Sequence, residues 1–458
     1  MNTPRVLWIV CTIWALFLNP LAGRAQPVTA ISAGGSHTLF LKRGGSLWSM
    51  GDNGAGELGF GNEIPTNRPQ QILSSNVTVV AAGWLDSLFL KSDGSLWAMG
   101  YDVMGELGDG DYVGSRQPEL IESNGVTAVA AGFWHSLFLR NDGSLWGMGG
   151  NGVGQLGGLP YNGNYAVTSP GQIVASNVTT IATGYEHSLF LKNDGSLWVM
   201  GANQYGELGD GTDTNANQPE QIEASNVVAI AGGTGYQAGH SLFLKSDGSL
   251  WGMGYNADGE LGDGTFNNTN RPELLVSSNV TAIAAGYYHS LFLKCDGSLW
   301  AMGRNNLGQL GDGTFNNANR PEQIVAGGVV AIAGGGNHSL FLKRDGSLWA
   351  MGMDNSGQLG DGTTIYGLGG NYTDATNQPE QILAPYNRIS GQSLGAGSVR
   401  LSFVGIGGAN YALDRSSSLS SPNWTPQTTN PASSFGTLVF TNTPNPAANN
   451  FWRVRSVP

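Results

Sequence analysis

The stretch His289-Ser-Leu-Phe-Leu-Lys-Cys-Asp-Gly-Ser-Leu-Trp-Ala-Met-Gly303 recurs seven times along this chain with small changes, each time followed by a Gly-[Glu/Gln]-Leu-Gly segment. The tryptophans of the seven copies lie 49 to 53 residues apart, at Trp48, Trp97, Trp146, Trp198, Trp251, Trp300 and Trp349. A period near 50 residues is typical of repeat architectures. Seven nearly equal units build a scaffold, so we expect function at the positions where the copies differ.

Each copy contains three short runs that are apolar or alternating, which indicates strands. An Asp-Gly pair such as Asp296-Gly297 separates the second run from the third and suits the positive φ of a tight hairpin turn. A Pro-x-x-Ile element such as Pro321 to Ile324 predicts a fourth strand at the outer edge, where proline is tolerated. The sequence therefore predicts an all-β fold, a seven-bladed β-propeller over residues 26–385.

The first copy begins close to the predicted mature N-terminus. We expect the segment Pro379 to Ile382 to supply the outer strand of the first blade and so to close the ring without a covalent bond. Such closure would leave the propeller with no open edges.

The phrases His-Ser-Leu-Phe-Leu, Asp-Gly-Ser-Leu-Trp and Gly-x-Asn-x-x-Gly-[Glu/Gln]-Leu-Gly-Asp-Gly resemble the repeats of the RCC1 (regulator of chromosome condensation) family over about residues 28–383. The resemblance implies a seven-bladed propeller. One departure is systematic, because methionine stands before the glycine where the family often has tryptophan. We expect these methionines in the core: Met50, Met99, Met148, Met200, Met253, Met302 and Met351.

The N-terminus has the pattern of a secretory signal peptide over residues 1–25. Arg5 precedes an apolar run from Val6 to Leu18, and Gly23-Arg24-Ala25 offers small residues for cleavage after Ala25. The run is shorter than the roughly 20 residues that a membrane-spanning helix needs. We therefore predict a secreted or cell-surface protein, without a membrane span and monomeric. Its single mature cysteine, Cys295, can form no internal disulfide.

Charge differs between the two parts of the mature chain. Residues 26–385 carry 14 basic and 32 acidic side chains, a net charge of −18, whereas residues 386–458 carry five arginines and one aspartate, a net charge of +4. The acidic main part argues against a nucleic-acid partner, which requires a basic surface.

The C-terminal residues 386–458 lack the repeat and predict a small β-sandwich module. Four segments alternate as strands do: Val399 to Val404, Asn410 to Leu413, Gly436 to Thr441 and Phe451 to Arg455. The pattern is similar to that of the short β-modules that end many secreted bacterial proteins.

The six histidines occupy one repeat position, and the second copy has Asp86 there. They are His37, His135, His187, His240, His289 and His338. One interpretation is a metal-binding or pH-sensing ring. The other, which we favour, is that each histidine caps or bridges strands within its own blade, because ligands spread around a ring cannot converge on one ion.

The Leu-Gly-Asp-Gly loops offer one aspartate each, and only the second copy offers a pair, Asp109 and Asp111. Calcium loops need several oxygens in one short segment, so the single aspartates are interpreted as turn residues. From the sequence we assign no catalytic residue, no cofactor and no metal site.

The most informative variation lies just before the histidine position, where five of the seven copies place aromatic residues in a loop between two strands. Equivalent loops of a propeller emerge on one face, so we predict an arc of aromatic side chains there. The predicted binding residues are Trp84, Phe133, Trp134, Tyr185, Tyr236, Tyr287 and Tyr288. Tyrosine and tryptophan suit a binding hot spot, but such rings can equally pack against neighbouring blades or plug the channel.

Three functions follow from these features. The first is a secreted, non-enzymatic binding protein whose propeller face engages an extracellular protein or a polysaccharide. The aromatic loops also resemble those of the secreted β-lactamase-inhibitor propeller of the RCC1 superfamily, although its target is not carried over. The second is a cell-envelope structural protein anchored by its basic C-terminal module. The third, by family analogy, is guanine-nucleotide exchange, against which the predicted export argues.

Overall fold

The computed structural model describes residues 26–160, 165–236, 238–363 and 375–383, together with the backbone of six strands within residues 390–457. The predicted signal peptide, residues 1–25, lies outside the described residues. Among the described residues, we find no helix long and apolar enough to cross a membrane. The chain divides into two units, and residues Val28–Leu383 form the larger.

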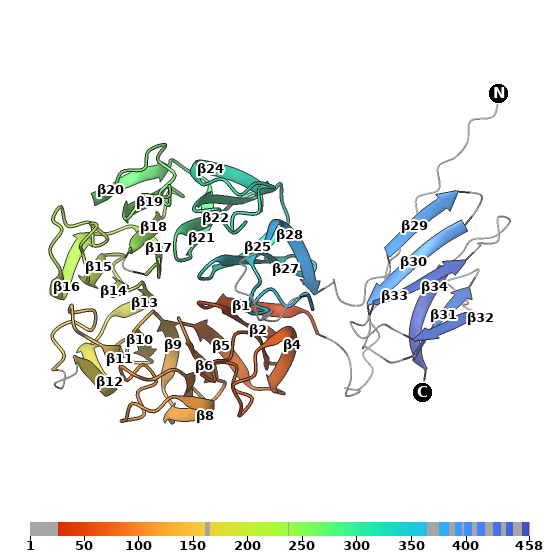
Figure 1. Cartoon of the computed structure of the whole chain (residues 1–458), viewed down its shortest axis with the longest axis horizontal. Helices are drawn as coiled ribbons and strands as arrows, with labels where there is room; N and C mark the ends of the chain where they lie inside the picture. The colour runs from red at the N-terminus through yellow and green to blue at the C-terminus, as the bar shows by residue number, and fades with distance from the viewer. Residues whose placement is uncertain are drawn as a thin grey trace. The chain divides into compact units, whose positions relative to one another are not determined.

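The larger unit is a β-propeller of seven four-stranded antiparallel sheets arranged around a central axis (Figure 1). This arrangement confirms the seven-bladed all-β fold predicted from the repeats. The innermost strands carry the short apolar run of each copy: β1 (Val28–Ala33), β5 (Val77–Ala82), β9 (Val126–Ala131), β13 (Val178–Thr183), β17 (Val227–Gly232), β21 (Val280–Ala285) and β25 (Val329–Gly334).

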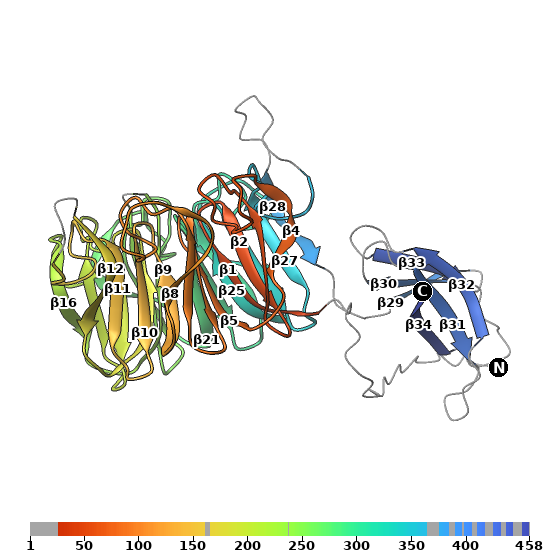
Figure 2. The same ribbon diagram turned by 90° about the horizontal axis from the view of Figure 1, so that it is seen from below.

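The second strand of each blade begins at the histidine position and is buried almost throughout: β2 (His37–Lys42), β6 (Asp86–Lys91), β10 (His135–Arg140), β14 (His187–Lys192), β18 (His240–Lys245), β22 (His289–Lys294) and β26 (His338–Lys343). The third strand contains the tryptophan and the methionine: β3 (Ser46–Gly51), β7 (Leu96–Gly100), β11 (Leu145–Gly150), β15 (Leu197–Gly201), β19 (Leu250–Gly254), β23 (Leu299–Gly303) and β27 (Leu348–Met353). Seen edge-on in Figure 2, these strands run between two faces that carry the loops.

The outer strand of each blade contains the proline: β4 (Thr66–Leu73), β8 (Ser115–Glu122), β12 (Ala166–Val174), β16 (Ala216–Glu223), β20 (Thr269–Val276), β24 (Ala318–Val325) and β28 (Ala375–Leu383). Strand β28 pairs with β27, so the segment Pro379 to Ile382 belongs to the seventh blade. The prediction that this segment completes the first blade is wrong, because β4 from the first copy already fills that place.

The ring instead closes through packing and hydrogen bonds between two complete blades. Leu342 and Leu348 of the last blade pack with Phe40 of the first. The Thr38 hydroxyl donates to the carbonyl oxygen of Gln358 at 2.9 Å, and the Gly336 N–H donates to that of Gly34 at 2.9 Å. These contacts join residues about 300 positions apart in sequence, with no strand exchanged between the ends of the chain.

The core lies between neighbouring blades. In the second blade, Leu88 and Leu96 contact Phe138 and Met148 of the third, and the same combination recurs around the ring. The seven methionines are fully buried, as predicted. In six of the seven pairs, the methionine sulfur lies less than 3 Å from where the Cβ of a larger residue would stand at a glycine of the preceding blade, for example Met99 against Gly59. Burying such a side chain stabilises the fold by about 1.5–3 kcal/mol.

The Asp-Gly-Ser-Leu-Trp phrase builds one hairpin turn and the platform beside it. In the second blade, Gly94 has φ +79°, and the Ser95 hydroxyl donates to Asp93 Oδ1 at 2.6 Å. Trp97 donates its ring N–H to Ser95 Oγ at 2.9 Å, and the Lys91 ammonium lies 3.6 Å from the centre of the Trp97 ring. The Asp-Gly-Ser-Leu-Trp motif, which is the strongest sequence signature of this chain, therefore stabilises the fold of each blade.

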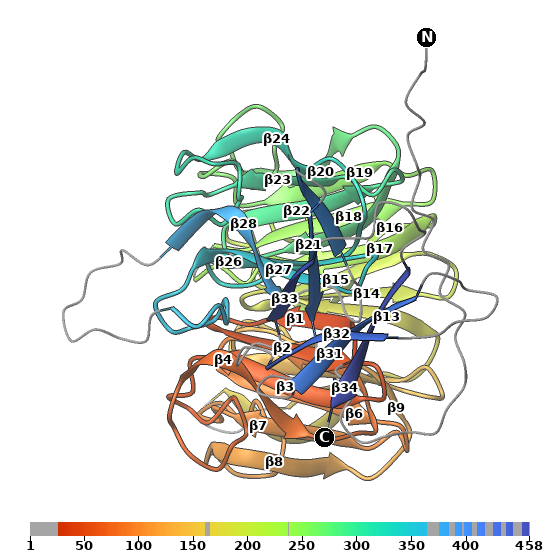
Figure 3. The same ribbon diagram turned by 90° about the vertical axis from the view of Figure 1, so that its right-hand side faces the viewer.

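The smaller unit contains two three-stranded antiparallel sheets. One has the order β29 (Ser390–Gly395), β30 (Ser398–Val404), β33 (Thr437–Asn442). In the other, β31 (Asn410–Ser416) lies between β32 (Thr425–Pro431) and β34 (Phe451–Val457), as Figure 3 shows. Four of these strands overlap the four predicted segments. The face-to-face sandwich stays a prediction.

Candidate functional site

The aromatic residues before the histidine position gather into one cluster, with Phe133 at its centre. The Phe133 ring stacks on Trp84, with 4.2 Å between ring centres, and meets Trp134 at 4.8 Å and Tyr185 at 4.7 Å, both edge to face. It also lies 5.9 Å from Tyr236 and 6.1 Å from Tyr287. Aromatic pairs at such spacings each contribute about 0.5–1.5 kcal/mol beyond burial.

The cluster reaches across the ring, because Phe133 comes from the third blade and Tyr287 from the sixth. Both belong to loops that leave the innermost strands at the same end of the central channel. The channel is a cavity of about 280 Å³ lined by small residues of all seven blades, such as Ala81, Ala131 and Ala285. The rings pack on one another over one mouth of the channel, which corresponds to the alternative that the sequence left open, in which they plug the channel.

Exposure divides the seven predicted residues. Phe133 and Tyr185 are buried, with 3% and 7% of their surface exposed, whereas Tyr236 is 55% exposed. Trp84, Trp134, Tyr287 and Tyr288 are half-buried. The buried rings hold the cluster in place, and Tyr236 with the half-buried rings presents it to solvent.

Three further tyrosines that were not predicted from the sequence join this face. Tyr101 lies edge to face against Trp84 at 5.8 Å, Tyr255 against Tyr288 at 6.1 Å, and Tyr205 against Tyr255 at 5.2 Å. Tyr101 and Tyr255 directly follow the Met-Gly that ends the third strand, whereas Tyr205 lies four residues beyond Gly201. Because the second and third strands are antiparallel, the end of one lies beside the start of the other, and this rule could have found Tyr101 and Tyr255.

Polar contacts hold the residues at the edge of the aromatic cluster in place. The Tyr288 hydroxyl donates to the carbonyl oxygen of Tyr236 at 3.0 Å. Arg304 lies over the Tyr288 ring, 4.0 Å from its centre, and pairs with Asp258 at 2.8 Å. Burial raises the pKa of Glu186, which also lies on this face. The face therefore combines aromatic surface with carboxylates.

The six histidines connect neighbouring blades, which corrects the prediction that each acts within its own blade. His187 Nε2 lies 3.0 Å from Ser241 Oγ of the next blade, and that hydroxyl donates to the carbonyl oxygen of Glu207 at 2.7 Å. Because the serine proton is used on the carbonyl, the Nε2–H of the histidine must be the donor to Oγ. Equivalent bonds start at His37, His135, His240, His289 and His338.

Burial keeps these histidines neutral. It lowers the pKa of His37 and His187 to about 4 and that of His135, His240, His289 and His338 to about 3. The nitrogens face successive blades and do not converge, so the ring is a set of structural links.

The second blade breaks this pattern. Asp86 replaces the histidine and is buried, and its Oδ2 has no hydrogen-bond partner among the described residues. Ser136 Oγ across the interface also has none within the described part of the chain. Burial raises the pKa of the Asp86 carboxyl well above its usual range, and the nearby Glu106 adds to this effect.

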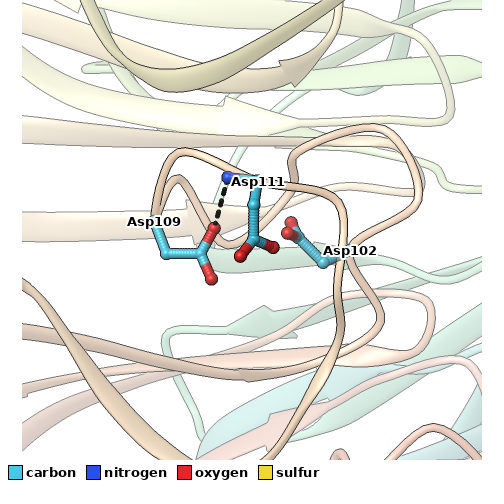
Figure 4. Close-up of side chains that lie close together, drawn as sticks. All are labelled: Asp102, Asp109 and Asp111. Carbon is cyan, nitrogen blue, oxygen red and sulfur yellow. Dashed lines mark hydrogen bonds between the residues drawn. The ribbon is translucent and has the colours of Figure 1, made fainter.

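The loop that follows strand β7 brings three carboxylates together. Oxygens of Asp102, Asp109 and Asp111 all lie within 4.8 Å of one another (Figure 4). Burial raises the pKa of Asp102 to about 8, and Asp109 contributes to that rise. In the sequence, Asp109 and Asp111 stand out as a pair, but their spacing from Asp102 gave no sign that the three come together, and no metal site was predicted.

The fold and the repeats place this chain in the class of β-propeller repeat proteins. Comparison with known families identifies the family within that class. The profile of the RCC1-like domain matches residues 15–276, and profiles of the regulator of chromosome condensation (RCC1) repeat match residues 280–309, 329–358 and 296–342. The chain belongs to the RCC1-like family.

Curated relatives share only part of their length with this chain. Human E3 ubiquitin-protein ligase HERC2 is 31% identical over 115 residues, which are 24% of this chain and 2% of that protein. The ultraviolet-B receptor UVR8 of Arabidopsis thaliana is 34% identical over 101 residues, 21% of each protein. The X-linked retinitis pigmentosa GTPase regulator homolog of Caenorhabditis elegans is 36% identical over 105 residues, 22% of this chain and 7% of that protein.

Solved structures share the fold. Human WBSCR16 matches with a TM-score of 0.64 and 22% identity, covering 74% of this chain and 94% of that one. Prp20p from Saccharomyces cerevisiae matches with a TM-score of 0.63 and 21% identity, covering 79% and 87%. At this level of identity the likeness concerns the fold alone.

Proposed function

We propose that this chain is an exported, non-enzymatic binding protein that engages an extracellular protein through its aromatic face. The observation that carries the proposal is the aromatic cluster itself. Buried Phe133 holds a group of tyrosines and tryptophans from several blades, and Tyr236 remains more than half exposed on it. Rigid aromatic side chains with an exposed edge are typical of binding hot spots.

A protein partner fits this surface better than a polysaccharide. Sugar rings stack on open aromatic faces, whereas one face of Trp84 is already covered by Phe133 and Tyr185 is buried. The edges and hydroxyls that remain suit a shape-complementary protein surface. Because residues 26–385 have a net charge of −18, we expect a basic patch on the partner. The relatives, which are named as a receptor, a regulator and ligases, support a binding or regulatory role.

The test compares wild-type mature protein with a Tyr236→Ala/Trp134→Ala variant. Partners are captured from medium and cell-surface fractions, identified by mass spectrometry, purified and measured by interferometry. Losing a hot spot of about 2 kcal/mol weakens Kd about 30-fold. Phe315→Ala is the matched control, because Phe315 is 50% exposed and is not among the rings that contact the cluster.

Equal affinity of wild type and the double variant for the captured protein would contradict the proposal, provided both unfold at the same temperature. Capture of a polysaccharide that is lost in the double variant would keep the site but change the partner class.

A second function, anchoring at the cell envelope, is favoured by the net charge of +4 on residues 386–458. Attraction to anionic polymers weakens with salt, because the Debye length falls from about 10 Å at 0.1 M to about 3 Å at 1 M. Extraction of the protein from cells by 1 M salt, together with loss of retention when residues 386–458 are deleted, is the expected result. Retention that is unaffected by the deletion would contradict anchoring.

A further inference from the structure

The acidic loop of the second blade differs from most of its counterparts at a position where five other blades place an asparagine amide. In the fourth blade, Asn203 Nδ2 donates to Asp210 Oδ1 at 3.0 Å and to the carbonyl oxygens of Thr212 and Thr214, both at 3.1 Å. One NH₂ group thus holds three oxygens of the loop together. The fifth and sixth blades place Asn256 and Asn305 in the same way.

In the second blade this amide is replaced by a carboxylate, while the oxygens it would bind remain. Asp102 stands at the position of Asn203, Asp109 at that of Asp210, and Asp111 at that of Thr212. The replacement removes the donor at the centre of the loop and adds two carboxylates. Three carboxylates facing one another without a donor repel, unless one of them holds a proton or a cation lies between them.

Asp102 is aimed into this group and lacks a partner on that side. The residue is 0% exposed, and its Oδ1 accepts the Leu107 N–H at 2.7 Å. Its Oδ2 is buried without a hydrogen bond among the described residues. In Figure 4 the carboxylates of Asp102 and Asp111 point toward each other. A buried, unpartnered carboxylate oxygen is costly and is the group that a bound cation would satisfy.

The other two carboxylates are held by the backbone of the same loop. Asp109 Oδ1 accepts the Asp111 N–H at 3.0 Å, and Asp111 Oδ1 accepts the Val113 N–H at 2.6 Å. Each keeps a second oxygen for a ligand. Both residues are exposed, so a cation and its remaining water ligands can reach the site from solvent.

We propose that residues 102–113 bind a calcium ion, which takes the place of the asparagine amide of the other blades. Asp102, Asp109 and Asp111 supply carboxylate oxygens. The carbonyl oxygens of Asp111 and Val113, equivalent to those that Asn203 binds, complete the protein ligands. A flexible, all-oxygen set of this size suits Ca²⁺, whereas Mg²⁺ demands a tighter octahedron. This proposal does not depend on the aromatic face having a partner.

The seventh blade supplies an internal comparison. Asp354 stands at the same position, opposite Asp361, but the third place is taken by Thr363. The Thr363 hydroxyl lies 3.5 Å from Asp354 Oδ2 and 2.7 Å from Asp361 Oδ1. With two carboxylates and a hydroxyl in place of three carboxylates, we expect this loop to bind calcium much more weakly.

The experiment is calorimetric titration of CaCl₂ into metal-free mature protein, with thermal unfolding in EDTA and in calcium. Wild type is expected to bind one Ca²⁺ with Kd of about 10⁻⁴–10⁻³ M, the range of extracellular modules, and to unfold at a higher temperature in calcium. Asp102→Asn should weaken binding at least tenfold. In EDTA this variant should unfold no lower than wild type, because asparagine is the residue of five other blades.

Two further variants keep the test decisive. Asp111→Thr installs the residue of the fourth blade and should also lose binding, whereas Asp354→Asn should leave the titration unchanged. Wild type that takes up no Ca²⁺ at about ten times the expected Kd, or Asp102→Asn that binds as tightly as wild type, would overturn the site. Equal affinity for Mg²⁺ would overturn the assignment to calcium.

Discussion

Blade two and blade four have the same scaffold but differ in their polar links. In blade two the ring centres of Phe89 and Trp97 lie 6.2 Å apart, and in blade four those of Phe190 and Trp198 lie 6.1 Å apart. Yet His187 links blade four to the next blade, whereas blade two has Asp86, whose Oδ2 lacks a hydrogen-bond partner in the part of the chain that the structure describes. The comparison teaches that the apolar and turn positions maintain the fold, while buried polar positions can change without disturbing it.

The substitutions with the largest expected effect test whether the cores beside blades two and four are equally stable. Phe89→Ala in blade two and Phe190→Ala in blade four should each lower the free energy of unfolding by about 3–5 kcal/mol. Both rings are fully buried between blades, so the two losses should agree. Urea denaturation measures them, and a much smaller loss in blade two would show that its core is looser than its strands suggest.

Exchanging the polar link should move stability in opposite directions. His240→Asp copies blade two into blade five, buries a carboxyl and removes the donor to Ser290, so it should cost about 2–3 kcal/mol. Asp86→His should restore a donor to Ser136 and add about 1 kcal/mol. Denaturation midpoints at pH 7 measure both. Destabilisation by Asp86→His would mean that the aspartate has a native partner.

The pH dependence of stability should reveal the buried glutamates. Burial raises the pKa of Glu57, Glu106 and Glu207 to about 7 and that of Glu260 to about 8. The native state then holds protons that the unfolded state releases, so stability falls as pH rises from about 4.5 through 8. The histidines act oppositely: their lowered pKa values make stability fall as pH drops from about 6.5 through about 3.

Above pH 6.5 the histidines no longer contribute, and burial lowers the pKa of Lys42 to about 8, so that residue opposes the carboxyls only above about pH 8. The window from pH 6.5 to 8 therefore isolates the carboxyls. Unfolding free energies measured there should decrease with pH. Glu260→Gln, which installs the residue of blade six at Gln309, should recover about 1–3 kcal/mol at pH 9. An unchanged slope in this variant would contradict the assignment of the effect to Glu260.

The smallest expected effect concerns the cation above each tryptophan. The ammonium groups of Lys91 and Lys192 lie 3.6 and 3.7 Å from the centres of the Trp97 and Trp198 rings. Replacing either lysine with methionine keeps the apolar stem and removes the charge, so each should cost about 0.5–1 kcal/mol. Thermal unfolding of the two variants should agree, and a difference would locate a hidden asymmetry between blades two and four.

Some features of the binding face could be foreseen from sequence and others could not. The loop position of Trp84 and Tyr236 followed from their place before the histidine. Their exposure did not follow, because it depends on which rings from distant copies pack together. Phe133, for example, packs near Tyr287, which is 154 residues away in the chain. The carboxylate of Asp102 was overlooked for a related reason: it lies seven residues before Asp109, and only the curvature of the loop brings the two together.

The sequence by itself determined the number of blades, the order of strands within each, the hairpin turns and the buried methionines. These properties are local, since a period of about 50 residues fixes one blade and glycine or alternating apolar residues fix its turns and strands. The tertiary structure alone decided how the ring closes, which blade each histidine contacts and which aromatic rings reach solvent. Those outcomes depend on neighbouring and opposite blades, whose contacts form only when the ring is complete.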